Sequence, residues 1–169
     1  MAGSETSSSK GGSSAGGDAG RRTWIALLRI YIGICFIYFS SDKLAQSYFN
    51  GMAGTLRDFA SSCQYPWYKD FLIDFAIPNA KLFAFLTCSG ELLVGIALVL
   101  GFITGLTSMI GIILNLNYYW ATSGIDSSSV HFMNLTFIAC QLVFIFTCAG
   151  RTLGVDKFLA KKILFKYLL

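Results

Sequence analysis

Charged residues are scarce in this sequence. Of its 169 residues only 13% are Asp, Glu, Lys or Arg, whereas 54% are hydrophobic, and the mean hydropathy is +0.60. A soluble domain carries roughly 25% charged residues, so this chain lacks the charge to cover a surface that faces water. We therefore expect most of its surface to face lipid, and its length suits one compact unit.

The sequence also lacks the residues of most catalytic and metal sites. His131 is its only histidine, which excludes any site in this chain that needs two. It contains no Walker loop and no GxGxxG, GxSxG or HExxH motif. Its five cysteines form no CxxC pair, and their odd number excludes a complete disulfide framework. We predict no metal site, no catalytic residue and no covalently bound cofactor.

Four apolar runs are each close to the ~20 residues that a membrane-crossing helix needs. They cover approximately residues 23–40, 81–102, 104–121 and 131–150. Residues 1–22 are rich in Ser, Gly and Ala and are predicted to be a flexible tail. The sequence thus predicts an all-α membrane protein, a bundle of four transmembrane helices in a membrane domain of residues 23–150.

Lysine and arginine gather at the two ends of the chain. The first end holds Lys10, Arg21 and Arg22, and the other holds Arg151, Lys157, Lys161, Lys162 and Lys166. By the positive-inside rule we expect both termini in the cytoplasm and the protein in the cell (inner) membrane. Residues 151–169 are predicted to be a basic segment on the inner surface, attracted to anionic lipid.

The long loop after the first run has helical patterning of its own. Apolar residues recur at helical spacing in two stretches, at Phe49, Met52, Leu56, Phe59 and Cys63 and then at Trp67, Phe71 and Phe75, up to Pro78. This spacing predicts two short amphipathic helices that lie at the outer membrane interface.

One carboxylate, Glu91, lies in the apolar run "TCSGELLVGIALVLG". Intramembrane ionisable groups normally face the bundle interior and pair there. If the first run enters the membrane near its own start, Arg29 lies about 9 Å deep and its side chain could reach Glu91. We predict a polar cluster of Arg29, Glu91, Gln141 and one of Asn115 or Asn117.

Two interpretations of this cluster stay open. The pair of Arg29 and Glu91 could be structural, with each charge neutralising the other, or it could belong to a quinone, substrate or proton site. His131 and Asn134 share the helical face of Gln141 and could extend the cluster. His131 could also be an axial ligand to a haem or chlorophyll, or a polar residue at the interface.

Three stretches, taken in order, resemble the DoxX-like family of membrane proteins. "LLRIYIGICFIYFSSDKL" is similar to its first helix, with an Arg, a Gly and an outer Lys-Leu. "GELLVGIALVLGFITG" is similar to its second helix, and "GRTLGVDKFL" to its exit from the fourth. The resemblance covers about residues 23–160 and implies a four-helix integral membrane protein. Its matched positions are Arg29, Lys43, Glu91 and Asp156.

The resemblance also has one departure. Family members often have Thr-Arg between the second and third helices, where this chain has Thr104-Gly105. A contact made by that Arg to a headgroup or a partner therefore does not carry over.

The resemblance implies a small subunit tied to quinone-linked electron transfer. We expect a non-catalytic accessory subunit that stabilises a larger redox complex and contacts quinone or lipid near Glu91. Its partners would be membrane lipid and other membrane subunits, with no nucleic acid. Two alternatives stay open: a pigment-, carotenoid- or lipid-binding accessory subunit of a photosynthetic or respiratory supercomplex, and a stand-alone quinone reductase component or small transporter. Quinone, carotenoid and chlorophyll are thus the candidate cofactors.

Overall fold

The computed structural model describes residues 13–125 and 128–159, and all regular structure in that part of the chain is helical. Four long helices form a bundle: α1 (Ser13–Ser41), α4 (Ala80–Leu100), α5 (Thr104–Ala121) and α6 (Ser128–Thr147). Between α1 and α4 come η1 (Asp42–Leu44), α2 (Gln46–Ser62), α3 (Pro66–Phe71) and the π-helical turn η2 (Leu72–Ala76). The short elements η3 (Ala149–Arg151) and α7 (Asp156–Leu159) follow α6.

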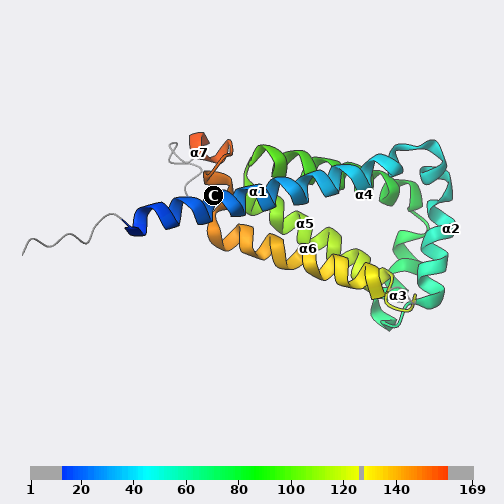
Figure 1. Cartoon of the computed structure of the whole chain (residues 1–169). Helices are drawn as coiled ribbons and strands as arrows, with labels where there is room; N and C mark the ends of the chain where they lie inside the picture. The colour runs from blue at the N-terminus through cyan, green and yellow to red at the C-terminus, as the bar shows by residue number, and fades with distance from the viewer. Residues whose placement is uncertain (1–12, 126–127, 160–169) are drawn as a thin grey trace, which may run out of the picture.

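The long helices pack as neighbours in pairs. α1 lies along α4, and α5 lies along α6 and also contacts α4 (Figure 1). α2 runs across one end of the bundle, which we call the cap end, and α7 lies at the opposite end, the α7 end (Figure 1). The first part of α1 projects beyond the other long helices at the α7 end (Figure 1).

Three helical segments in the described residues are long and apolar enough to cross a membrane. They are Gly20–Leu44, Ala80–Leu100 and Ser128–Thr147. α5 is not among them, because Asn115, Asn117 and an aromatic end interrupt its apolar run. The prediction of an all-α membrane protein is confirmed, whereas its count of four crossings is not.

The structure corrects the predicted start of the first helix. α1 begins at Ser13, inside the stretch predicted to be a flexible tail. Extending an existing helix adds one hydrogen bond for each residue fixed, so a long apolar helix can recruit the small residues that precede it. The predictions for residues 1–12 and 160–169 lie outside the described part of the chain.

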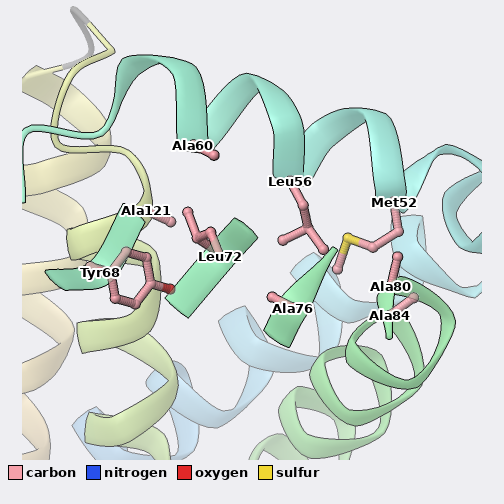
Figure 2. Close-up of a cluster of buried hydrophobic side chains, with 9 residues drawn as sticks. All are labelled: Met52, Leu56, Ala60, Tyr68, Leu72, Ala76, Ala80, Ala84 and Ala121. Atoms are coloured by element: carbon pink, nitrogen blue, oxygen red, sulfur yellow. The ribbon is translucent and has the colours of Figure 1, made fainter. Parts of the chain in front are cut away.

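The predicted amphipathic helices are confirmed as α2 and as α3 with η2. Met52, Leu56 and Ala60 follow one another on the inner face of α2 and are buried. They point toward a buried layer from the rest of the cap and from the ends of α4 and α5 (Figure 2). That layer is Tyr68, Leu72, Ala76, Ala80, Ala84 and Ala121. This packing fixes the cap on the bundle.

α1 and α4 approach each other closely at two glycines. A Cβ added to Gly33 would lie 2.8 Å from the carbonyl oxygen of Gly95, and one added to Gly95 would lie 2.9 Å from that of Gly33. Small residues at a crossing let helix backbones come into contact, which is the main source of packing energy where lipid replaces water. The crossing sets the register of α1 against α4.

Candidate functional site

The carboxylate of Glu91 forms an ion pair with Lys43. The Lys43 ammonium donates to both carboxylate oxygens, at 2.6 and 2.7 Å, and to the Tyr118 hydroxyl at 2.7 Å. Glu91 is only 4% exposed, and the Lys43 ammonium lies 4.6 Å from the centre of the Tyr118 ring. A buried charge pair is tolerable when both members are hydrogen-bonded, and this geometry satisfies all three Lys43 donors.

Each member of the pair comes from a different element. Lys43 lies in η1, just past the end of α1, and its long stem carries the ammonium back to Glu91 on α4. Tyr118 comes from the last turns of α5. Tyr48 on α2 interacts with Tyr118, and burial raises the pKa of Tyr48 to about 12.

A cavity of about 290 Å³ lies against this ion pair. Its polar lining is Asp42, Lys43, Glu91, Asn115, Tyr118 and Asn134, and its apolar lining is Phe36, Phe39, Val130, Met133 and Phe137. The rings of Phe36 and Phe137 lie 5.6 Å apart across α1 and α6. Small-molecule sites are mostly apolar hollows of roughly 300–1,000 Å³ with a few polar groups, and the volume of this cavity lies just below that range.

The predicted pairing of Arg29 with Glu91 is wrong. The Arg29 guanidinium lies at the α7 end, where its Nη2 donates to the Leu153 carbonyl at 2.8 Å. A Cβ on Gly101 would overlap that guanidinium, so Arg29 lies level with the end of α4. Glu91 is about 15 Å further along α4, at 1.5 Å per residue. The prediction counted depth from Thr23, but α1 begins earlier and projects beyond the bundle.

Asp156, a position matched only by family resemblance, closes the α7 end. Its carboxylate accepts from the backbone N–H groups of Ile103 at 2.6 Å and Thr104 at 2.9 Å. These are free donors at the start of α5, where a negative charge is favourable. The Asp156 N–H donates to the Gly101 carbonyl at 2.9 Å, and its charge interacts with that of Arg29.

The remaining predicted site residues separate into different places. Asn115 and Asn134 line the cavity, and each amide donates to its own helix, at Gly111 and Val130. Gln141 is fully buried against Gly111, away from the cavity lining.

Two other polar residues lie toward the cap end. Asn117 accepts a hydrogen bond from Tyr68. His131 lies with Nε2 3.3 Å from the Thr122 hydroxyl and its ring edge-on to Tyr119. The structure thus places Asn115 in the lining of the same cavity as Glu91, and keeps Arg29 and Gln141 apart from that ion pair.

Sequence reasoning missed Tyr118 as a member of the site. It lies three residues after Asn115 and therefore on the same helical face. That spacing was the available signal.

Helices of membrane-crossing length around a buried ion pair define this as an integral membrane protein of the helical class. The DoxX family model matches residues 24–124, and the chain belongs to the DoxX family. The matched region contains Arg29, Lys43, Glu91 and Tyr118 and ends before Asp156. No curated protein and no solved structure matches the chain significantly.

Proposed function

We propose that this protein is an accessory subunit of a quinone-linked redox complex and that its cavity holds the ring of a quinone. The observation that carries the proposal is the cavity itself, in which a buried ion pair and an aromatic wall face the same space. The family resemblance supports the accessory role, with other membrane subunits and lipid as partners.

The lining chemistry suits a quinone ring. A quinone presents two carbonyl oxygens on a flat apolar ring, so it needs hydrogen-bond donors at its edge and apolar contacts on its faces. The Tyr118 hydroxyl and the second N–H of Asn134 are donors in the lining. Phe36 and Phe137 offer ring contacts.

The proposal places α5 as a fourth membrane crossing, with both chain ends on the cytoplasmic side of the inner membrane. Its 18 residues span about 27 Å, close to the ~30 Å of a hydrocarbon core. Asn115 on α5 is 5% exposed, so one of the residues that lower the hydropathy of this helix faces the bundle interior.

The quinone site can be tested by filling the cavity. Met133 lines the cavity, and Leu135, two residues away on α6, is exposed and does not line it. A short-chain ubiquinone should raise the melting temperature of the purified protein and of Leu135→Trp, because a ligand that binds the folded state stabilises it. Met133→Trp should show no such rise. An equal rise in all three, or none in the parent, would contradict the site.

The accessory role has a separate test. The protein should be purified from its native membrane in mild detergent, with identification of every chain that accompanies it. Stoichiometric partners that carry redox centres are the expected result. If the protein is purified without partners, the accessory role is contradicted. The quinone site would then be judged by the ubiquinone experiment alone.

A further inference from the structure

Several buried polar atoms in the described part of the chain have no hydrogen-bond partner there. They are Nε and Nη1 of Arg29, the hydroxyls of Thr104 and Ser108, and both amide atoms of Gln141. All four side chains are 0–1% exposed. Leaving such an atom dry costs the desolvation of the group, so buried polar atoms almost always have a protein or water partner.

Two of these groups, the hydroxyls of Thr104 and Ser108, belong to residues on one face of α5. Thr104, Ser108, Gly111 and Asn115 recur at steps of three and four residues, which place them on one side of a helix. The Gln141 amide occupies the space in front of Gly111, where a Cβ would overlap it. These positions, which we call the row, extend from Thr104 to Asn115, about 16 Å along the helix axis.

The two ends of the row lie at the two sites already described. A Cβ on Gly150 would overlap both the Thr104 hydroxyl and the Asp156 carboxylate, so these two groups share one small space at the α7 end. At the other end, Asn115 lines the cavity together with Glu91. The row thus joins the α7 end to the ion pair through the interior of the bundle.

We propose that Thr104, Ser108 and Gln141 hold a file of water molecules that connects the α7 end to the Lys43–Glu91 cavity and lets protons pass between them. Water supplies the missing partners, because one molecule both donates and accepts and buried waters typically bind about three polar groups. Hydroxyl, amide and water groups in sequence form a hydrogen-bonded chain along which a proton can move. Supplying protons to a bound quinone rests on the proposed function, whereas the water file does not.

Isosteric removal of one hydroxyl tests whether the row is wet. Thr104→Val is matched by Thr136→Val on α6, where the hydroxyl is exposed and bonded to the Phe132 carbonyl. A hydrated row loses a water partner, so Thr104→Val should melt at a lower temperature than Thr136→Val. A dry row loses an unsatisfied oxygen, so an equal or higher melting temperature for Thr104→Val would overturn the proposal.

Proton access is tested with a thiol at the cavity end of the row. Asn115→Cys is placed in lipid vesicles with different pH on the two sides and reacted with methyl methanethiosulfonate, which modifies only thiolate. Peptide mass spectrometry reads residue 115 separately from the native cysteines, and trypsin cleavage after Lys157 reports which side holds the α7 end.

The rate at residue 115 should rise severalfold per pH unit on the α7 side. Adding Ser108→Val should abolish that dependence, whereas Thr107→Val, a neighbour that lines a different hollow, should leave it unchanged. The proposal would be overturned if the rate at residue 115 did not depend on pH on the α7 side, or if Ser108→Val did not alter that dependence. Neither experiment contains a quinone, so their failure would not contradict the quinone site. Failure of the ubiquinone experiment would likewise not contradict the water file.

Discussion

The ion pair between Lys43 and Glu91 makes a specific stability pattern. Removing one member leaves the other charge buried without its partner. Removing both leaves no unpaired buried charge, so that cost disappears. Glu91→Leu and Lys43→Met should each lower the free energy of unfolding by about 3 kcal/mol. The double variant should be close to the parent. Denaturant titration in mixed micelles measures all four proteins.

The control for this cycle is Lys81→Met, which removes an exposed lysine at the start of α4. It should change the unfolding free energy by less than about 0.5 kcal/mol. If the double variant loses the sum of the two single losses, the pair is not coupled and its assignment is wrong.

Gly101 combines two requirements that only glycine meets. Its φ is +64°, and an added Cβ would overlap the guanidinium of Arg29. Gly101→Ala should therefore lower the unfolding free energy by at least about 1 kcal/mol, the usual cost of a left-handed alanine, with displacement of Arg29 added to it. Chemical denaturation of the purified variant checks this value.

Gly51 is the control for Gly101, and its substitution should stabilise the protein. Gly51 lies within α2 with open space around its Cα. Gly51→Ala should raise the unfolding free energy by roughly 0.5–1 kcal/mol, because alanine loses less backbone entropy in a helix. Equal effects of the two substitutions would show that Gly101 has no special role.

The crossing of α1 and α4 depends on Gly33 and Gly95. Gly33→Ala brings a methyl group within 3 Å of the α4 backbone, so the helices must separate, at a cost of about 1–3 kcal/mol. Gly90→Ala on α4 is the control, since its methyl group would meet Leu114 at an ordinary 3.6 Å. Thermal unfolding of both variants in the same detergent compares them. A smaller loss for Gly33→Ala than for Gly90→Ala would contradict the crossing.

The cap helices carry tyrosines whose hydroxyls resist ionisation. Burial raises the pKa of Tyr48 from 10.0 to about 12 and raises that of Tyr68 further. The unfolded chain therefore loses these protons first as pH rises. The contribution of these two tyrosines to stability should be constant below about pH 10 and should fall between pH 10 and 12. The melting temperature measured across this range should fall less in Tyr48→Phe than in the parent, whereas Tyr38→Phe, at an exposed residue, should follow the parent.

The helices were predictable because their signals are local. The apolar run at 104–121 coincides with α5, and helical spacing found both helices of the cap. The hydrogen-bond partner of Arg29 was not predictable. The depth of a residue in the membrane can be counted only from the point where its helix enters the membrane, and the sequence does not fix that point. Sequence patterning placed that boundary at Thr23, and the helix continues to Ser13. Family resemblance, which matched Lys43 and Asp156, supplied two residues that local reasoning could not.

The topology of the whole chain depends on whether α5 crosses the membrane. If it does, Phe102 at its start and Ser123 beyond its end lie on opposite sides, and Ser62 lies on the same side as Ser123, because a Cβ on Gly124 would overlap Ser62. A membrane-impermeant maleimide should therefore label Phe102→Cys from one side of the vesicle, and Ser123→Cys and Ser62→Cys from the other. Labelling of Phe102→Cys and Ser123→Cys from the same side would exclude a crossing by α5.

Closure of the α7 end by Asp156 has a consequence for biosynthesis. The ribosome makes residues 150–156 only after all four long helices, yet these residues hold Arg29, complete the start of α5 and bond the end of α4. Until they emerge, the growing chain must insert α1 with an arginine that lacks its final hydrogen-bond acceptor, the Leu153 carbonyl. A chain that stops before this turn would therefore contain the four long helices without the contacts that close the α7 end.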